Sequence, residues 1–400
     1  MATCRDAKAP YLAHMSGSLA RAATAHSAVL VEPAQRITIC RVNWRKARDL
    51  FVRTMPVIEA QGKSLPERIL SVLTHDRYLR GGKRTKDAVR KYRAVALERL
   101  RHSIGSYEPI EIILPSFPLK CTHPLKMNGH RADMAEISAF AKFHELCEQI
   151  RRIYPSGAVI YIVQDGMLHF EDFGRCKTEV RQYASDLQQI VRLMGLQNEI
   201  KFLDLREEFE KQPDRCGALA RARAEVAQEV QAPENQKHFE AVVSSSFAIL
   251  KNSHLPREMV RRIFTLGEEQ LCADEIITKR VFGARAAEAA IRFLAYDRAI
   301  EHLDLYTRIR RYALRGSVHT GPGRISIRFH AKGTCILPWM GVAVKEGDEM
   351  TVKYVCDVEH DPIYLPVYVQ GAQHPLYFTT RACLQSGFCS SGAPDERPQR

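Results

Sequence analysis

Three short apolar runs, separated by two stretches of helical spacing, constrain the fold of this chain more than any other feature. The runs occupy residues 110–114, 158–163 and 200–205, and the helical stretches between them occupy 134–153 and 177–194. Strands that are apolar on both faces and alternate with helices are typical of a parallel sheet covered by helices on both sides. The sequence therefore predicts an α/β fold with a Rossmann-like parallel sheet core at about 105–206.

The pattern differs on either side of this core. Residues 36–104 are basic and have helical spacing, which predicts a helical lead-in, and 207–315 are mainly helical in pattern. In 316–384 the apolar residues change to a period of two, which predicts a small antiparallel β unit and thus a smaller C-terminal α+β part. The polar ends, 1–35 and 385–400, are predicted to be a loosely ordered tail and a disordered tail.

The net charge of +13 is concentrated in one segment. Residues 41–101 hold 17 Lys and Arg against 6 Asp and Glu. A basic surface attracts any anion, including nucleic acid, an acidic partner or a phosphorylated small molecule, and a solvated helical face has the same composition. Because the segment has few aromatic side chains for base stacking and no known reader motif, we expect no nucleic acid partner; a nucleic-acid-binding protein is the alternative.

Other sequence features exclude several classes of protein. No run approaches the ~18 consecutive apolar residues of a membrane helix, so we expect no membrane partner. The eleven cysteines are an odd number without a C-x-x-C pair, which is typical of reduced thiols in the cytoplasm. No H-E-x-x-H or Cys/His cluster indicates a metal, and no G-x-G-x-x-G or G-x-x-x-x-G-K-[ST] motif indicates a nucleotide cofactor.

Two loops at strand ends form the candidate site, because ligands of open parallel sheets bind outside the carboxyl ends of the strands. The loop after the first strand contains Ser116, Lys120 and Lys126 and ends at Asp133. Lys120 can meet a phosphate as an ammonium, attack a ketone as a free amine, or lie solvated. Asp133 can act in catalysis or simply cap the following helix, with Glu136 completing a capping box.

The second loop follows 158–163, begins at Gln164 and contains Asp165-Gly166. A carboxylate at this strand end faces the ligand crevice and suits the binding or deprotonation of an amine, although Asp-Gly is also a common turn pair. His169, further along the loop, can belong to the site or can be a packed core residue.

These residues belong to a series of motifs that resembles the isocyanide (isonitrile) synthases, also called the pyoverdine/dityrosine biosynthesis family. The motifs are Leu-Pro-Ser-Phe-Pro-Leu-Lys at 114–120, Asp-Met-Ala-Glu at 133–136, Asp-Gly at 165–166, Lys-Arg at 279–280, Arg-Gly-Ser-Val-His at 315–319 and Pro-Trp-Met-Gly at 338–341. Together they cover about residues 105–345.

The resemblance implies an enzyme of the lyase class that condenses the α-amino group of an amino acid, tyrosine or tryptophan, with the C2 ketone of ribulose 5-phosphate. The amine becomes an isocyanide whose carbon comes from the sugar phosphate, in the biosynthesis of a specialised metabolite. A branch of the same family serves the dityrosine pathway, and an amino-acid-modifying enzyme of that type is the alternative. No metal or organic cofactor is implied, the partners are the two small-molecule substrates, and the oligomeric state stays open.

The resemblance also suggests residues that bind the substrates. Arg280, Arg315 and Lys126 are the candidates for the phosphate and carboxylate groups, because such anions need fixed cations. Ser116 and Trp339 are further substrate-binding candidates. Two of these residues have structural alternatives: Arg280 can pair with a neighbouring acid, and Trp339 can belong to the core.

Four residues are candidates for the catalytic chemistry: Lys120, Asp133, Asp165 and His319. Asp165 is the candidate for orienting or deprotonating the amine, and His319 for shuttling a proton, because the ordinary pKa of histidine lies near neutrality. His319 can instead cap a turn. Whether Lys120 forms an imine or only binds phosphate stays open at this level.

Overall fold

The computed structural model describes most of the chain between residues 37 and 383. The described residues are 37–39, 42–45, 48, 58, 63–79, 83–120, 126–127, 129–172, 174–255, 257–317, 323–327, 336–347, 349–380 and 382–383. The predicted tails at 1–35 and 385–400 lie outside these residues, and so does His319.

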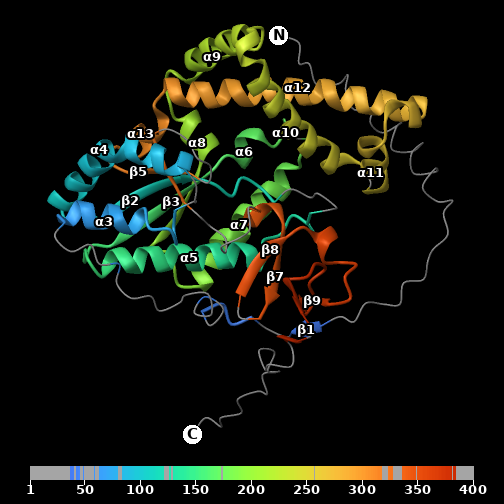
Figure 1. The fold of residues 1–400 in the computed structure, drawn as a ribbon. Helices are drawn as coiled ribbons and strands as arrows, with labels where there is room; N and C mark the ends of the chain where they lie inside the picture. The colour runs from blue at the N-terminus through green and yellow to red at the C-terminus, as the bar shows by residue number, and fades with distance from the viewer. Residues whose placement is uncertain are drawn as a thin grey trace. The chain divides into compact units, whose positions relative to one another are not determined.

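The described residues form two five-stranded sheets and the helices around them (Figure 1). In chain order the elements are β1 (Ile37–Ile39), α3 (Leu65–Leu73), α4 (Lys83–Gly105), β2 (Ile110–Pro115), α5 (Met134–Arg151), β3 (Ala158–Gln164), α6 (Gly166–His169), α7 (Lys177–Leu193), β4 (Ile200–Asp204), α8 (Leu205–Glu210), α9 (Arg215–Glu229), α10 (Gln236–His254), α11 (Arg257–Thr265), α12 (Ala273–His302), α13 (Leu305–Ile309), β5 (Leu314–Ser317), β6 (Ile325–Ser326), η4 (Pro338–Met340), β7 (Val342–Glu346), β8 (Glu349–Lys353), β9 (Tyr364–Val369) and β10 (Tyr377–Thr380).

The first sheet has the strand order β4-β3-β2-β5-β6, and every neighbouring pair is parallel. Helices α5 and α7 connect its strands β2, β3 and β4. This arrangement confirms the predicted α/β fold with a Rossmann-like parallel sheet.

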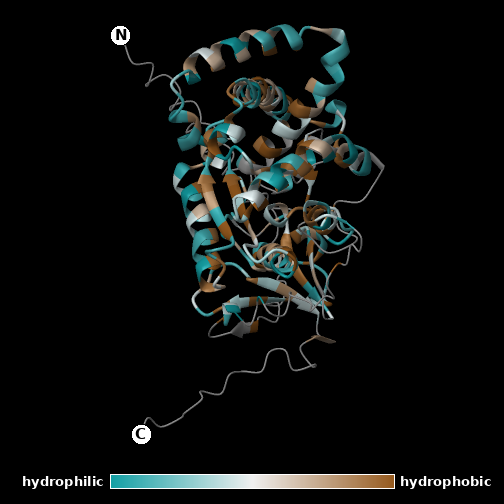
Figure 2. Ribbon diagram, turned by 90° about the vertical axis from the view of Figure 1, so that its left-hand side faces the viewer, coloured by the Kyte–Doolittle hydropathy of each residue, from teal (hydrophilic) through white to brown (hydrophobic). Residues whose placement is uncertain are grey.

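Successive side chains of a strand point to opposite sides of the sheet. In the central strands the side chains on both sides are buried, because helices cover both faces of the sheet. Ile112 and Ile160 pack in one core with α3, α4, α5 and α7, whereas Ile113 and Tyr161 pack on the other face with α8, α9, α12 and α13. Figure 2 shows hydrophobic residues gathered on these strands. The two-sided burial explains why the strands are apolar runs in the sequence.

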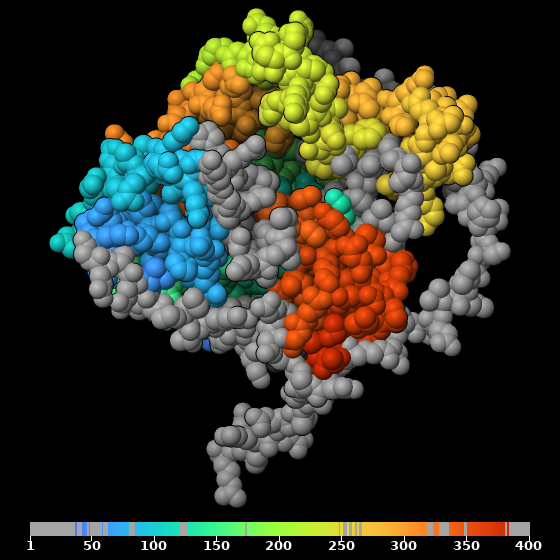
Figure 3. Space-filling view, viewed as in Figure 1, coloured from blue at the N-terminus to red at the C-terminus, as the bar shows by residue number. Residues whose placement is uncertain are grey.

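The second sheet has the order β1-β9-β10-β7-β8. Its residues Ala343, Val352 and Val367 belong to the same core as Phe140 and Leu146 of α5, so α5 packs against both sheets. In Figure 3 the orange to red residues of this sheet form one continuous part of the surface. The predicted smaller C-terminal part is therefore present and is attached to the parallel sheet through α5.

The strand partners differ from the expectation of an antiparallel unit at 316–384. Strand β5 pairs in parallel with β2, and β6 with β5, so both extend the first sheet. Within the second sheet β10 pairs in parallel with β7, and β1, from the predicted helical lead-in, pairs in parallel with β9. A period of two identifies a strand but carries no information about its partner, which explains the difference.

No helix in the described part of the chain is both long enough and apolar enough to cross a membrane.

Candidate functional site

The strand order of the parallel sheet reverses between β2 and β5. From β2 the chain adds β3 and β4 on one side, and later β5 and β6 on the other. At such a reversal the carboxyl ends of the strands leave a crevice where ligands bind. Ser116, directly after β2, and Ser317, at the end of β5, are buried at this edge.

Lys120 lies in the loop between β2 and α5, with only 2% of its surface exposed. Its Nζ lies 2.6 Å from Asp133 Oδ2 and 3.0 Å from Glu136 Oε2. Asp133 is the N-cap of α5, and the Asp133 N–H donates a hydrogen bond of 2.8 Å to Glu136 Oε2, as in a capping box. Tyr183 of α7 donates a hydrogen bond of 3.0 Å to Glu136 Oε1. The structure thus brings the predicted residues Lys120 and Asp133 together.

One ammonium and two carboxylates are buried in this group. Burial by itself lowers the pKa of Lys120, but Asp133 and Glu136 outweigh it and hold that pKa above its ordinary value. Burial raises the pKa of Glu136 to about 7, against the opposing effect of Lys120. Near neutral pH, therefore, Lys120 is an ammonium with its charge balanced at short range, while Glu136 is close to its titration midpoint.

Lys120 and Asp133 border a cavity of about 620 Å³, which we call the Lys120 cavity. Its volume lies within the range of small-molecule sites, roughly 300–1,000 Å³. The wall of the cavity also contains apolar and polar side chains from several elements, among them Trp44, Ile190, Leu376, His130, Arg131, Asp186 and His374. A ligand with an apolar body and charged groups matches such a lining.

The charged groups of this wall are held in place by the protein. Arg131 donates hydrogen bonds of 2.5 and 2.8 Å to Asp186, and Gln182 donates another of 3.0 Å to the same carboxylate. The bonds to Asp186 come from Nε and Nη2 of Arg131, and the side chain of Arg131 as a whole is 52% exposed. Burial, assisted by His130 and Arg131, lowers the pKa of His374, so His374 is a neutral imidazole near pH 7.

A second polar group, the Asp165 cluster, consists of Asp165, Asp297, Tyr306 and Arg315. Burial raises the pKa of Asp165, to which Asp297 contributes, and burial together with these two carboxylates raises the pKa of Tyr306. The guanidinium of Arg315 lies 5.4 Å from the centre of the Tyr306 ring, and its Nη2 lies 2.9 Å from Asp304 Oδ1. Within the described residues, Asp165 Oδ1 and Arg315 Nε are buried without a hydrogen-bond partner.

The Lys120 cavity and the Asp165 cluster lie on neighbouring loops. A Cβ on Gly166 would lie 1.7 Å from the carbonyl oxygen of Pro118, so the backbones of the two loops are in direct contact. The side chains of Lys120 and Asp165 nevertheless have different partners among the residues that the structure describes. Of the predicted catalytic residues that the structure describes, Lys120 and Asp133 therefore lie in one group and Asp165 in another, at the same edge of the sheet.

Two predicted substrate-binding residues do not join either group. Arg280 is exposed on α12 and lies 4.0 Å from Glu268, which corresponds to the ion-pair alternative. Trp339, in η4, is buried in the core with its ring centre 4.7 Å from that of Phe117, which corresponds to the core alternative.

The remaining predicted substrate-binding residues in the described structure have local partners. The Nζ of Lys126 lies 4.8 Å from the centre of the Tyr354 ring. Ser116 donates a hydrogen bond of 3.2 Å from its Oγ to the carbonyl oxygen of Leu114. Neither residue borders the Lys120 cavity.

The sequence carries little signal for four other residues of these groups. Tyr183 and Asp297 lie within helices outside any motif, and Tyr306 precedes the motif at 315–319, so only tertiary packing places them at the site. Arg131 stands two residues before Asp133 in the loop after the first strand, and this position was its one available signal.

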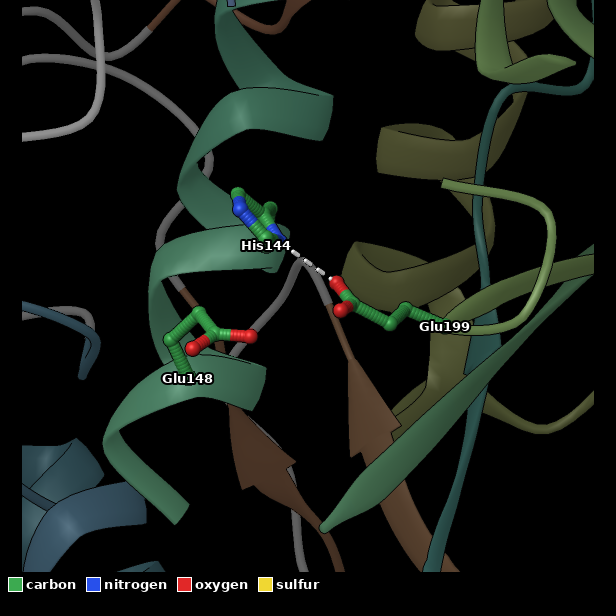
Figure 4. A group of neighbouring side chains, drawn as sticks. All are labelled: His144, Glu148 and Glu199. Atoms are coloured by element: carbon green, nitrogen blue, oxygen red, sulfur yellow. Dashed lines mark hydrogen bonds and ion pairs between the residues drawn. The ribbon is translucent and has the colours of Figure 1, made fainter. Parts of the chain in front are cut away.

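Within the described chain, one group of side chains has the composition of a metal site: His144, Glu148 and Glu199 (Figure 4). His144 Nδ1 lies 2.6 Å from Glu199 Oε2. Arg151 pairs with both carboxylates, at 3.0 Å from Glu199, so a guanidinium already balances their charge. Glu199 also precedes β4, at the edge of the sheet opposite the Lys120 cavity. We assign no metal to this group.

The family model for pyoverdine/dityrosine biosynthesis proteins matches residues 100–364, about two thirds of the chain. The chain belongs to this family. The match includes Lys120, Asp133 and the Asp165 cluster, and it confirms the family predicted from the motifs.

Several curated proteins with similar sequences are named as isonitrile synthases. An L-tyrosine isonitrile synthase of Pseudomonas aeruginosa is 34% identical over 135 residues, which cover 33% of this chain and 40% of the relative. One of Xenorhabdus nematophila is 33% identical over 110 residues, 26% of this chain and 31% of the relative. The L-tryptophan isonitrile synthase AmbI1 of Fischerella ambigua is 36% identical over 95 residues, 24% of this chain and 30% of the relative. The matched segments thus span less than half of these relatives.

The crystal structure of the PvcA protein from Pseudomonas aeruginosa has a similar fold. It superimposes with a TM-score of 0.62 at 21% sequence identity, covering 79% of this chain and 100% of that structure. At this level of identity the similarity establishes the fold shared by this family member and PvcA, not a common substrate.

Proposed function

We propose that this protein is an isonitrile synthase that condenses the α-amino group of tyrosine or tryptophan with ribulose 5-phosphate. Family membership and the names of the relatives support the reaction, because these relatives are called L-tyrosine and L-tryptophan isonitrile synthases. The sugar phosphate, the lyase class and the absence of a cofactor come from the family resemblance and are part of the proposal.

The observation that carries this proposal is the composition of the Lys120 cavity. An aromatic amino acid has an apolar ring, an ammonium and a carboxylate, and the wall of the cavity offers a partner for each. Trp44 and Ile190 can pack against the ring, and Asp133 can bind the ammonium. The half-exposed side chain of Arg131, whose bonds to Asp186 come from Nε and Nη2, can bind the carboxylate. A buried apolar surface with a few fixed polar groups is typical of small-molecule sites.

The electrostatics of Lys120 favour one of its two predicted roles. An imine forms only from a free amine, whereas Asp133 and Glu136 hold Lys120 as an ammonium. The same two carboxylates balance its charge, which leaves little attraction for a phosphate. We therefore propose that Lys120 acts on the carboxylate of Asp133, through the ion pair between them. In this proposal Lys120 neither forms an imine nor binds the phosphate.

The Asp165 cluster is the proposed location of the sugar phosphate. It lies at the strand-order reversal, where this fold class binds ligands, and Arg315 supplies a guanidinium whose Nε has no partner in the described structure. Asp165 would contact a sugar hydroxyl from the other side, because the amine is assigned to Asp133 in the Lys120 cavity. His319 stays a proposed proton shuttle outside the described residues.

The test is an assay with the purified full chain, tyrosine or tryptophan, and ribulose 5-phosphate. We expect an isocyanide in the mass spectrum, formed only when both substrates are present. Ribulose 5-phosphate labelled uniformly with carbon-13 should add one labelled carbon to the product. A panel of amino acids that yields no sugar-dependent product would rule the proposal out.

A second candidate is an amino-acid-modifying enzyme of the dityrosine type. The spore wall maturation protein DIT1 of Saccharomyces cerevisiae is 30% identical over 100 residues, 25% of this chain and 19% of that protein. The same assay separates the two candidates, because this reaction would consume the amino acid without forming an isocyanide.

A further inference from the structure

The carboxylate that borders the Lys120 cavity has a second carboxylate behind it. Asp133 lines the cavity, whereas Glu136 is completely buried and does not. The Nζ of Lys120 connects them, at 2.6 Å from Asp133 Oδ2 and 3.0 Å from Glu136 Oε2. On the far side of Glu136, Tyr183 donates a hydrogen bond of 3.0 Å to Glu136 Oε1. A continuous chain of hydrogen bonds thus leads from the cavity into the protein interior.

The hydrogen-bonded group of Asp133, Lys120 and Glu136 contains a different number of charges from an ordinary buried ion pair. On the same helix, Glu145 is also buried and accepts hydrogen bonds from Arg77 and from Tyr78, so one cation faces one carboxylate. Lys120 instead faces two carboxylates, which leaves one negative charge unbalanced when both are ionised. Because an uncompensated buried charge is costly, a proton on one carboxylate is the natural compensation.

We propose that Glu136 is the proton acceptor behind Asp133 and that Lys120 relays the proton between the two carboxylates. The inference rests on the proposed function, in which the amino acid enters as an ammonium and must react as a free amine. In this scheme Asp133 is the catalytic residue that contacts the substrate, and Glu136 is a positioning residue that acts through Lys120.

The proton transfers balance. The substrate ammonium gives one proton to the carboxylate of Asp133. Lys120 gives one proton from its Nζ to Glu136 Oε2 and takes the proton from Asp133 Oδ2. One proton has then moved from the substrate to Glu136, Lys120 is again an ammonium and Asp133 again a carboxylate. The substrate nitrogen keeps the electron pair of the broken N–H bond and can attack the ketone.

The pH dependence of this relay follows from the groups around Glu136. These are Lys120 from the loop after β2, Asp133 from the cap of α5, Tyr183 from α7, and next to them the Arg131–Asp186 pair. Burial and Glu136 raise the pKa of Tyr183 well above its ordinary value, so Tyr183 stays a hydrogen-bond donor. The pKa of Glu136 is about 7, so Glu136 can accept a proton above this pH and is already protonated below it. Activity should therefore rise as the pH increases through about 7.

The test compares Glu136→Gln with the matched control Glu145→Gln in the full chain. Glutamine keeps the size of the side chain and can hydrogen-bond to the Asp133 N–H and to Tyr183, but it cannot accept a proton. We expect Glu136→Gln to lower kcat/KM about 10²-fold above pH 7 and to abolish the rise through pH 7. Glu145→Gln changes a buried glutamate of the same helix outside the cavity and should keep the rise.

A measurement without substrate tests Glu136 separately. A carboxyl with a higher pKa in the folded than in the unfolded chain binds its proton more tightly when folded, so its stabilisation is present at low pH and is lost as the pH rises through about 7. The free energy of unfolding of the wild type, relative to Glu136→Gln, should thus decrease between about pH 5 and pH 8.

The outcomes separate this inference from the proposed function. A constant difference in unfolding free energy across this pH range would overturn the relay, whatever the activity. An active wild type whose pH profile is shared by Glu136→Gln would overturn the relay and leave the proposed function intact. If the wild type forms no isocyanide at any pH, the proposed function fails and the relay to a substrate amine fails with it, even where Glu136 titrates as expected.

Discussion

Lys120 and Lys126 follow the same strand, yet the structure gives them different surroundings. Lys120 is buried between two carboxylates, whereas Lys126 is half-buried over the ring of Tyr354. From the sequence, both lysines were candidates for contact with an anionic substrate group, and Lys120 was also a candidate for the chemistry at the ketone. Their partners decide which charge is available, and for Lys120 this charge is already balanced inside the protein.

This difference predicts unequal effects on stability. Lys120→Met leaves two buried carboxylates without a cation, which should lower the free energy of unfolding by about 3–5 kcal/mol. Lys126→Met removes a cation–π contact and should cost about 0.5–1 kcal/mol. Urea denaturation of both variants at pH 8, where Glu136 is mostly ionised, measures the two losses. Equal losses would contradict the assigned role of Lys120 in the core of the site.

At the scale of elements, the loop after β2 is held from two sides. Phe117 adopts φ 53°, a left-handed conformation that is rare for residues other than glycine. Its ring packs 5.2 Å from that of Phe140 and 4.7 Å from that of Trp339, while the next residue, Pro118, abuts Gly166 of α6. Trp339 and Gly166 therefore contribute to the site indirectly, because they fix the loop that carries Lys120.

The close approach at Gly166 yields a prediction about this element. Gly166→Ala places a Cβ 1.7 Å from a backbone oxygen, so α6 and the loop must separate. We expect a loss of several kcal/mol in unfolding free energy together with weaker binding at the Lys120 cavity. Gly283→Ala in α12 is the control, since a Cβ there meets nothing within 4 Å and alanine should stabilise the helix by up to about 1 kcal/mol. Thermal unfolding of both variants measures the two changes in stability. A Gly166→Ala protein as stable as the Gly283→Ala control would contradict the close packing of Gly166 against Pro118.

At the scale of the whole molecule, one core joins parts of the chain that are far apart in sequence. It contains Ile69 of α3, Ile112 of β2, Phe140 of α5 and Tyr377 of β10. Strand β5 pairs with β2 although it follows about two hundred residues later. The Rossmann-like core predicted at 105–206 therefore shares its apolar faces with the segments on both sides.

This shared core predicts the behaviour of fragments. A chain of residues 105–206 alone lacks β5 and exposes the faces that α3, α4, α12 and the second sheet cover in the whole protein. We expect it to show little fixed tertiary structure by near-ultraviolet circular dichroism and to unfold without a cooperative transition. The full chain, in contrast, should unfold in a cooperative transition. A cooperatively folded 105–206 fragment would mean that the sheet core is an independent domain.

The sequence by itself determined the elements of the core and the family. The predicted strands at 110–114 and 158–163 end within one residue of β2 and β3, and the helix predicted from 134 begins where α5 begins. Apolar runs, helical spacing and caps are local properties, so neighbouring residues are enough to define them. Lys120 and Asp133 also lie in one loop of the sequence, but their ion pair was not predicted and only the structure shows it.

Only the tertiary structure decided which strands pair and which side chains meet. It placed β5 and β6 in the parallel sheet and β1 in the other one, and it divided Lys120 and Asp165 between two polar groups. It also buried Glu136, a residue with the pattern of an ordinary helix cap, between a lysine and a tyrosine from another helix. Pairing and burial depend on contacts between segments distant in the chain, and the period of a segment contains no information about such partners.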